Sequence, residues 1–393
     1  MKGITTPLVS LEKMTLGNLL TIKSGKGFKA SEYSLEGRPL LQIENVSYGF
    51  IKWNEPSYLP EDYRDSVPDL VLQEGDIVLA LNRPITNGQL KIARLTAKDA
   101  GAILYQRVGK VISTGAVSYD YLYHLIGFHI KEFVESKSIG SDQPFISIRE
   151  LYQHPLSVVV CQKEQQKIAE FLTSVDTKIS QLTEKHRLLK EYKKGVMQQI
   201  FSQKVRFKDE DGKAFPEWTY ESIGKYLEPH KELVRADTDI PILTSSRTGL
   251  YLQERSVINE GDYGVVPLGH FTYRHMSDDL IFKFNVNRTW EKGAVSKEYP
   301  VFKVVGMDTY FLETQLNEGN DFKRFAIQQK QGGTRTRLYF KNLKELKLNL
   351  PCLKEQQRIS LFLQSIDTKI EGVAEQTEQT KQFKKGLLLQ MFV

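Results

Sequence analysis

Cysteine is scarce in this sequence: only Cys161 and Cys352 occur among 393 residues. Two thiols are too few to staple a secreted domain, or to build a zinc site without histidines at ligand spacing, so we expect two buried structural thiols. No apolar run approaches about 18 residues, and no signal-peptide pattern follows Met1. These absences favour a cytoplasmic protein with no membrane contact.

A strong charge imbalance is also missing. The chain has 54 Lys and Arg against 48 Asp and Glu, a formal net charge of +6. Cations and acids nearly balance within each part of the chain, so no segment is a basic arm. Any contact with nucleic acid must therefore come from Lys and Arg side chains arranged on a folded surface.

Catalytic motifs are absent too. The sequence contains no G-x-x-x-x-G-K-[ST] phosphate loop, no N-P-P-[YF] or D-P-P-[YF] tetrapeptide, no H-E-x-x-H and no G-x-S-x-G. The seven histidines form no ligand pair on a helix, so we expect no metal site. Acid-x-Lys triplets begin at Asp176, Asp367 and Glu345, and we interpret them as solvated surface. The chain is expected to catalyse nothing by itself.

An internal repeat organises the chain. The segment that begins at Cys161 returns at Cys352, and 20 of the 41 positions from 161 to 201 are identical at an offset of 191 residues. A fainter similarity links Leu16-Gly17-Asn18-Leu19-Leu20 to 223–227, and 140–151 to 332–343. The whole half-chain was therefore duplicated, and its globular parts diverged more than the repeated segments.

The repeated segments carry apolar residues with the 3.5-residue period of coiled coils. In the first copy, one heptad position holds Ile168, Val175, Leu182, Leu189 and Val196, and the other holds Leu172, Ile179, His186, Lys193 and Ile200. A helix from about 164 to 201 would be roughly 57 Å long and needs a partner. We expect the two copies to form an intramolecular coiled coil. We interpret the polar residues His186, Lys193 and Lys384 in its seam as specifying register or as partly exposed.

The remaining segments have short apolar runs bounded by Gly, Pro and Asn, which are typical of strands in mixed α/β domains. We therefore predict an α+β protein with two such domains joined by two long helices. The expected boundaries are 1–158 for the first domain, 159–203 for the first helix, 204–350 for the second domain and 351–393 for the second helix.

Several loop-like stretches combine cations with glycine or aromatic residues, which suits contacts to DNA phosphates and base edges. Single stretches of this kind are weak signals, and sequence alone does not rank them. The candidates are Lys26, Lys29, Arg83 and Lys91 in the first domain, and Arg247, His270, Tyr273, Arg274, Arg335 and Arg337 in the second.

The order of domain, long helix, domain and long helix resembles the specificity subunit of type I restriction-modification enzymes. The resemblance rests on Glu164-Gln165-Gln166-Lys167-Ile168-Ala169 and Glu355-Gln356-Gln357-Arg358-Ile359-Ser360, on 193–201, and on Val205-Arg206-Phe207-Lys208-Asp209. It covers the full chain, strongly over the helices and weakly over the domains. It implies two target-recognition domains, each reading half of a bipartite double-stranded DNA sequence. It also implies an antiparallel, pseudo-twofold helix pair that sets the gap between the half-sites.

The resemblance further implies that the catalysts are separate chains. Two methyltransferase subunits carrying S-adenosylmethionine would dock on this chain, and motor-nuclease restriction subunits would use ATP and Mg²⁺; this chain itself would hold no cofactor. Inserting one heptad after Leu182 is expected to change the gap and leave the half-sites intact. The alternatives left open are a coiled-coil scaffold with protein-binding ends and a silent or phase-variable copy of the subunit.

Overall fold

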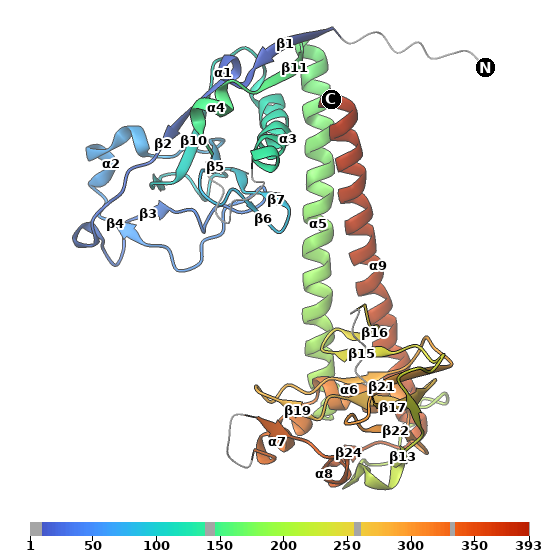
Figure 1. Cartoon of the computed structure of the whole chain (residues 1–393). Helices are drawn as coiled ribbons and strands as arrows, with labels where there is room; N and C mark the ends of the chain where they lie inside the picture. The colour runs from blue at the N-terminus through green and yellow to red at the C-terminus, as the bar shows by residue number, and fades with distance from the viewer. Residues whose placement is uncertain (1–9, 138–145, 255–260, 331–334, 393) are drawn as a thin grey trace. The chain divides into compact units, whose positions relative to one another are not determined.

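The computed structural model describes residues 10–137, 146–254, 261–330 and 335–392, which fall into two compact units (Figure 1). Unit 1 comprises Met1–Thr183 and Glu375–Val393, and unit 2 comprises Glu184–Ala374. Each unit contains one globular domain and part of each of two 40-residue helices, α5 (Gln162–Phe201) and α9 (Leu353–Phe392). The predicted α+β class with two domains and two long helices is confirmed.

Both long helices begin at equivalent residues. The carbonyl of Cys161 accepts hydrogen bonds of 3.0 Å from the backbone N–H groups of Glu164 and Gln165, and the carbonyl of Cys352 accepts one from Gln356. The side chain of Cys161 is exposed and that of Cys352 is half-exposed. The expectation of two buried thiols is therefore wrong, because these residues contribute backbone groups to a helix start rather than side chains to a core.

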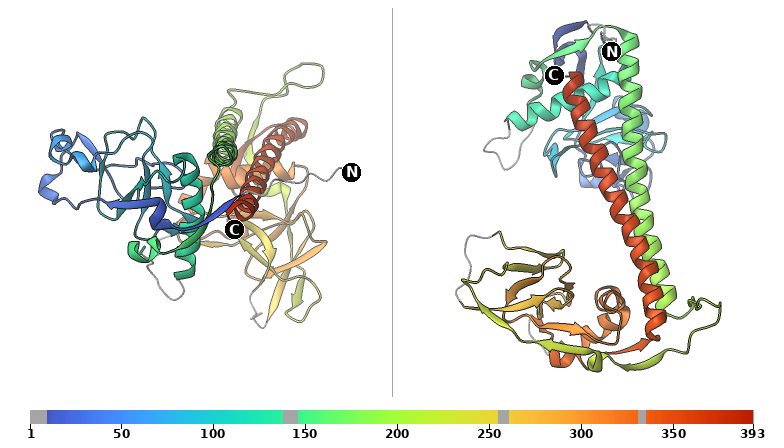
Figure 2. Two further views of the ribbon diagram at one scale, coloured as in Figure 1. Left: turned by 90° about the horizontal axis from the view of Figure 1, so that it is seen from above. Right: turned by 90° about the vertical axis from the view of Figure 1, so that its right-hand side faces the viewer.

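In unit 1, an antiparallel sheet of order β2-β10-β5-β8 packs against helix α3, and α3 packs along the first half of α5 (Figures 1 and 2). Strand β5 is buried at all four positions, as expected of a central strand. The strands of unit 1 are β1 (Leu11–Thr15), β2 (Leu20–Ser24), β3 (Arg38–Leu41), β4 (Tyr58–Leu59), β5 (Ile77–Ala80), β6 (Ile85–Thr86), β7 (Gln89–Leu90), β8 (Ile92–Arg94), β9 (Ile103–Leu104), β10 (Val108–Ser113) and β11 (Pro155–Val159). Its helices are α1 (Leu16–Leu19), η1 (Ala30–Glu32), α2 (Tyr63–Ser66), η2 (Pro68–Leu70), α3 (Tyr119–Lys137) and α4 (Ile148–Tyr152).

Unit 2 contains a sheet of the same kind, in the order β13-β22-β18-β20, and two shorter helices, α6 and α7, in place of α3. Its core is rich in phenylalanine, with Phe271 and Phe302 stacked at 5.0 Å. The strands are β12 (Thr219–Ser222), β13 (Leu227–His230), β14 (Leu233–Arg235), β15 (Leu243–Ser246), β16 (Gly249–Leu252), β17 (Asp262–Pro267), β18 (Phe271–Tyr273), β19 (Met276–Ser277), β20 (Phe284–Val286), β21 (Lys292–Ser296), β22 (Val301–Val304), β23 (Thr336–Arg337) and β24 (Lys347–Leu350). The helices are η3 (Ile223–Tyr226), α6 (Thr309–Glu318), α7 (Asn320–Gln328) and α8 (Phe340–Leu343).

The faint similarity between the domains corresponds to equivalent backbone contacts. In unit 1 the N–H of Leu16 donates to the carbonyl of His154, and in unit 2 the N–H of Ile223 donates to that of Leu346. The next residue in each case is glycine. A Cβ at Gly17 or Gly224 would lie 3.0 Å or 2.5 Å from the carbonyl oxygen at the end of α4 or α8. Part of the second similarity, 140–145 and 332–334, lies outside the described residues.

A duplicated glutamine attaches each long helix to its domain. Gln165 accepts a 2.8 Å hydrogen bond from the N–H of Ser118 and donates one of 2.7 Å to the carbonyl of Val159. Gln356 makes the equivalent pair of bonds, 2.9 Å each, with the N–H of Asp308 and the carbonyl of Pro351. Both amides are buried, so each bridges two backbone groups that would otherwise lack partners.

Within each unit the two long helices run antiparallel and are joined by an ion pair between duplicated residues. In unit 1, Lys384 of α9 donates to Asp176 of α5, and Phe392 packs in the same cluster as Leu172. In unit 2, Lys193 of α5 lies 2.8 Å from Asp367 of α9. The aspartates belong to the acid-x-Lys triplets, so the interpretation of both as solvated surface is wrong. Lys193 and Lys384 do specify register, by pairing with the other copy.

Candidate nucleic-acid interface

In unit 1, three loops meet at one edge of the main sheet, which we call the unit 1 loop edge. Strands β2 and β5 both end where the antiparallel strand β10 begins. The loops are 25–29, 81–84 and 105–107. Backbone hydrogen bonds join them: Gln106 donates to Lys26 (3.1 Å), and Leu81 donates to Arg107 (2.9 Å). Gly25 is required there, because a Cβ would lie 2.3 Å from the carbonyl oxygen of Tyr105.

The unit 1 loop edge carries exposed cations. Lys26, Lys29 and Arg83 are all exposed, and Lys26 lies 5.7 Å from the centre of the Phe28 ring. The same edge presents Arg107, which was not among the residues predicted from the sequence. None of the four forms an ion pair with another residue in the described part of the chain. Their charges are therefore free to face a phosphate backbone.

Both arginines of the unit 1 loop edge have unusual backbone conformations. Arg83 has a φ of +45° and Arg107 a φ of +67°, in the left-handed region that residues with side chains seldom adopt. Arg83 also precedes Pro84, which disfavours α-type conformations. Surrounding hydrogen bonds hold this loop, since Leu81 accepts from Ile146 and Pro84 accepts from Lys91. Strain of this kind clusters at functional sites, which is consistent with a role for the edge in binding.

Lys91, the remaining candidate of unit 1, is placed differently. Its side chain is half-buried, and its Nζ donates a 3.3 Å hydrogen bond to the carbonyl of Ile43. The ammonium group therefore satisfies a backbone acceptor inside the domain. Lys91 supports the fold near the edge and is not part of the exposed cation set.

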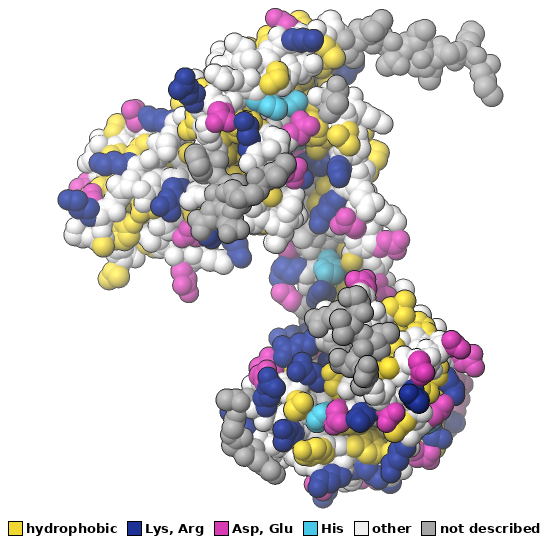
Figure 3. Space-filling model, in the orientation of Figure 1, with side chains coloured by type: hydrophobic (Ala, Val, Ile, Leu, Met, Phe, Trp, Pro, Cys, Tyr) yellow, Lys and Arg dark blue, Asp and Glu magenta, His cyan; other side chains and the backbone are white. Residues whose placement is uncertain are grey.

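In unit 2, a cleft of about 920 Å³ is lined by three cations, Arg247, Arg274 and Lys283, and by two acids, Glu254 and Asp278, together with serine, threonine and tyrosine side chains. Lys and Arg side chains are numerous on this side of unit 2, around β19 (Figure 3). Lys283 was not singled out from the sequence, because it stands alone between apolar residues. The mixture of cations and hydroxyl groups suits contacts to phosphate and base edges.

The arginines of unit 2 fall into two groups. Arg247 pairs with Asp279 (2.7 Å) and Arg335 with Asp278 (2.9 Å), so a carboxylate partly neutralises the charge of each arginine. Arg274 and Arg337 are exposed and form no ion pair within the described ranges. Arg337 faces Met276 across the β19–β23 ladder. The preceding loop residues 331–334, part of the stretch that suggested Arg335 and Arg337, lie outside the described residues.

The two other candidates of unit 2, Tyr273 and His270, are less exposed than the arginines. Tyr273 is fully buried, and its hydroxyl donates to the carbonyl of Leu338 at 3.1 Å. Its selection as a DNA-contacting residue is wrong, because its place on β18 points it into the aromatic core. His270 is half-exposed, with its ring 5.2 Å from that of His230. Burial lowers the pKa of His270, so the ring is neutral at pH 7.

Comparison with known proteins identifies the family. The sequence profile described as "Type I restriction modification DNA specificity domain" matches residues 9–191 and 300–382, more than half of the chain. The chain therefore belongs to this family, and the resemblance of the repeated helices is confirmed. No described helix is long and apolar enough to cross a membrane.

Two curated relatives share part of the chain. The type I restriction enzyme MjaVIII specificity subunit of Methanocaldococcus jannaschii is 38% identical over 200 residues, which are 50% of this chain and 47% of that protein. The EcoAI specificity subunit of Escherichia coli is 30% identical over 156 residues, 39% of this chain and 26% of that protein. The chain thus spans about half or less of the length of the curated relatives that it matches.

Solved structures share the fold. A type I restriction-modification S subunit from M. genitalium aligns with a TM-score of 0.59 and 13% identity, covering 98% of this chain and 96% of that one. A chain from a study of complex assembly and conformational transition in a type I restriction-modification system aligns with a TM-score of 0.54 and 14% identity, covering 98% of both chains. At these identities the likeness concerns the fold alone.

Proposed function

We propose that this chain is the DNA-binding specificity subunit of a type I restriction-modification enzyme. Each unit would read one half of a bipartite double-stranded DNA target, with the long helices setting the gap. The observation that carries this proposal is that two domains built on the same frame each present exposed arginines that form no ion pair with any described residue. Arg83 and Arg107 serve unit 1, and Arg274 and Arg337 serve unit 2.

Family membership supports the assignment of partners. We infer that two methyltransferase subunits and the motor-nuclease restriction subunits bind this chain and carry S-adenosylmethionine, ATP and Mg²⁺. The absence of the searched catalytic motifs from the sequence agrees with a non-catalytic role. The partner subunits would then supply the pocket into which the target adenine is flipped for N6 methylation.

The first test is single-molecule sequencing of host DNA with the gene present and deleted. We expect one bipartite N6-methyladenine motif with a fixed gap to disappear on deletion. If no motif disappears, binding to purified methyltransferase subunit separates the alternatives. Binding would indicate a silent copy of the subunit, whereas lack of binding together with lack of salt-dependent DNA affinity would favour a protein-binding scaffold.

A second test assigns the half-sites to the units. We expect Arg83→Ala with Arg107→Ala to weaken DNA binding by about tenfold and to relax one half-site, and Arg274→Ala with Arg337→Ala to do the same at the other. The matched controls are Arg149→Ala on α4 and Lys341→Ala on α8. Both are exposed cations at equivalent positions on short helices and are not among the candidate residues. A tenfold loss in the controls, or no loss in either pair, would contradict this assignment.

A further inference from the structure

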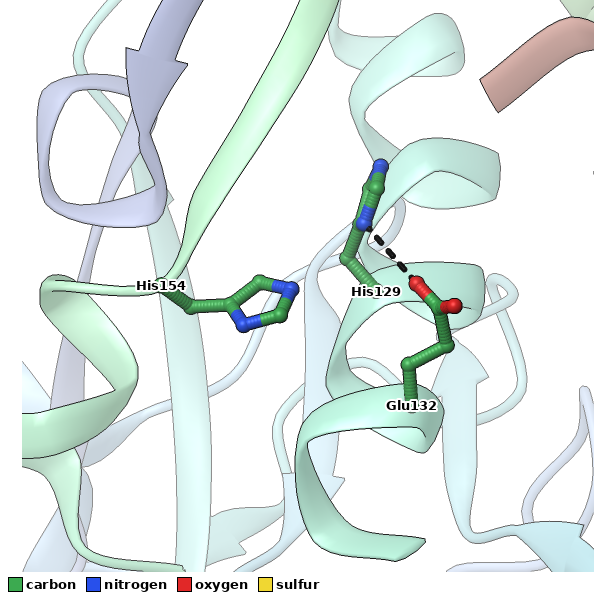
Figure 4. A group of neighbouring side chains, drawn as sticks. All are labelled: His129, Glu132 and His154. Carbon is green, nitrogen blue, oxygen red and sulfur yellow. Dashed lines mark ion pairs between the residues drawn. The ribbon is translucent and has the colours of Figure 1, made fainter. Parts of the chain in front are cut away.

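Unit 1 contains a cluster of two histidines and a glutamate that the DNA-reading function does not use. His129 and Glu132 lie three residues apart on one face of α3, and His154 lies between α4 and β11. One ligand atom from each residue lies within 4.8 Å of the others. His129 Nδ1 is 3.3 Å from a carboxylate oxygen of Glu132, and the His154 ring faces both (Figure 4). Sequence spacing does not reveal this group, because His154 is distant along the chain.

His129 needs an explanation of its own. Only 5% of the residue is exposed, and neither ring nitrogen has a hydrogen-bond partner in the described part of the structure. Phe128 and Phe392 lie against the ring and offer it no acceptor. A neutral imidazole has one donor and one acceptor nitrogen, and leaving both unsatisfied in a buried place is costly. An ion or a water bound at the ring would satisfy one of these nitrogens.

The turn that carries His154 is fixed, and the cluster is reachable from solvent. The N–H of His154 donates to Leu151 and its carbonyl accepts from Leu16, each at 3.0 Å, so the turn is fixed. Its ring packs against Phe133 at 5.9 Å. His154 and Glu132 are both partly exposed, which leaves a route from solvent.

We propose that His129, Glu132 and His154 bind one divalent transition-metal ion, with Zn²⁺ the preferred ion and water in the fourth position. Two imidazoles and one carboxylate are a donor set typical of zinc. Bonds of about 2.0 to 2.1 Å in a tetrahedron place ligand atoms roughly 3.3 Å apart. His129 and Glu132 already have this separation, and a ring nitrogen of His154 lies within 4.8 Å of both ligand atoms.

Unit 2 fills the equivalent place differently, which makes the site specific to unit 1. By its hydrogen bond with Ile223, Leu346 corresponds to His154, and it is buried in a hydrophobic cluster that includes Phe322. In unit 2, helix α7 and the residue before strand β24 are therefore joined by apolar packing. In unit 1 the bound ion would join α3 to the entry of β11, beside Phe392 of α9.

The test uses the full chain without an affinity tag, freed of metal by a chelator and titrated with Co²⁺ as a spectroscopic probe. We expect one equivalent of Co²⁺ to give the intense visible absorption of a tetrahedral site, Zn²⁺ to displace it, and Zn²⁺ to raise the melting temperature. Glu132→Gln and His154→Ala should each weaken binding by on the order of tenfold or more. The partly exposed positions of these residues make the variants suitable, whereas buried His129 is avoided because its replacement could prevent folding.

The matched controls keep the proposal falsifiable. Glu135→Gln alters a glutamate one turn further along α3, which pairs with Lys131 instead of the cluster. His186→Ala alters a histidine of α5 outside it. Both controls should bind Co²⁺ like the unaltered chain. The proposal is overturned if the chain binds no stoichiometric Co²⁺ or Zn²⁺, or if Glu132→Gln and His154→Ala bind as tightly as the controls.

Discussion

Unit 1 and unit 2 hold the same helix ion pair in different surroundings. In unit 1, Asp176 of α5 pairs with Lys384 of α9, and in unit 2, Asp367 of α9 pairs with Lys193 of α5. The two aspartates are copies of each other in the repeat, and so are the two lysines. The third group differs: His124 lies 3.7 Å from Asp176, whereas the hydroxyl of Tyr310 donates to Asp367. The difference teaches that the repeat determines the ion pairs between the helices. Each domain then contributes a different side chain beside its ion pair.

The largest effect is expected from a change in the register in which α5 and α9 pair. A heptad inserted after Leu182 alone lengthens α5 by about 10 Å and shifts one ion pair relative to the other. The structure changes the sequence-based expectation that one heptad after Leu182 would alter only the gap, because α5 pairs with α9 on both sides of that residue. We expect this single insertion to lose either Asp176–Lys384 or Asp367–Lys193 together with its apolar seam, and to abolish target binding. Binding assays and thermal unfolding of the purified chain measure both effects.

The matched variant carries a second heptad after Val373, the residue equivalent to Leu182 at the offset of 191. We expect this double insertion to restore folding and to widen the gap by about 3 base pairs, at roughly 3.4 Å per base pair, with unchanged half-sites. Methylation sequencing reads the gap. Altered half-sites, or a single insertion that behaves like the double one, would show that the helices are not a paired spacer.

The next effect concerns duplicated glutamates with different burial. Glu355 is fully buried, and both its carboxylate oxygens accept from Arg206, while Trp218 Nε1 donates to one of them at 3.0 Å. Glu164 is half-exposed and forms no ion pair with any described residue. Glu355→Ala removes the buried carboxylate partner of Arg206, which keeps only an ion pair with exposed Glu217, and should lower the free energy of unfolding by about 3 kcal/mol. Glu164→Ala should change it by less than about 0.5 kcal/mol, and equal effects in urea unfolding would refute the contrast.

A smaller difference is expected between the two aspartates. The side chain of Lys193 is 12% exposed and that of Lys384 is 25% exposed. Burial lowers the pKa of Lys193, but its hydrogen bond to Asp367 and the charges of Glu318 and Asp367 outweigh burial and raise it. Asp367→Asn should therefore cost roughly 2 kcal/mol and Asp176→Asn roughly 1 kcal/mol. Chemical denaturation of both variants tests the order, and the reverse ranking would be inconsistent with it.

Low pH should destabilise unit 1 in part through protonation of His124. Burial lowers its pKa from 6.5 to about 4, with Lys384 and Arg94 also opposing its charge and Asp176 and Asp120 favouring it. Between these pH values the unfolded state takes up a proton that the folded state does not. The stabilising contribution is complete above pH 6.5 and falls by about 1.4 kcal/mol per pH unit toward pH 4.

Hydrogen exchange measured in the presence of a chelator reports this acid effect by region. Peptides from α3 should lose protection as the pH falls from 6.5 to 4, the interval set by His124, and peptides from α6 should lose less. Burial also lowers the pKa of His129 on α3 to about 4, so His129 contributes over the same interval. The variant His124→Gln removes one of these two titrating groups and should reduce the pH dependence in α3 by about half. An unchanged slope in this variant would assign the acid response to other groups.

The sequence predicted the helices because their pattern is local. The heptad period and the 191-residue offset predict two long helices from Ile168, Leu172 and their copies alone. Lys193 and Lys384 were expected to specify register for the same reason. The aspartates that pair with them were misjudged, because an i-to-i+7 pattern says nothing about which distant charge lies opposite.

The candidate site was predicted less well. The exposed cations Lys26, Lys29, Arg83, Arg274 and Arg337 were found from loop composition, which is a local property. Tyr273 and Lys91 have the same composition around them, but strand register and a distant carbonyl turn them inward. Arg107 was missed because its importance depends on the strands β2 and β5 ending beside it.

The sequence by itself determined the family, the duplication and the long helices, because helix periodicity and identity between copies are properties of neighbouring residues and of one offset. Only the tertiary structure decided which charges pair, which candidate cations remain exposed, and that His154 meets His129 and Glu132. These depend on contacts between segments far apart in the chain, whose side-chain directions are set by strand register and helix packing.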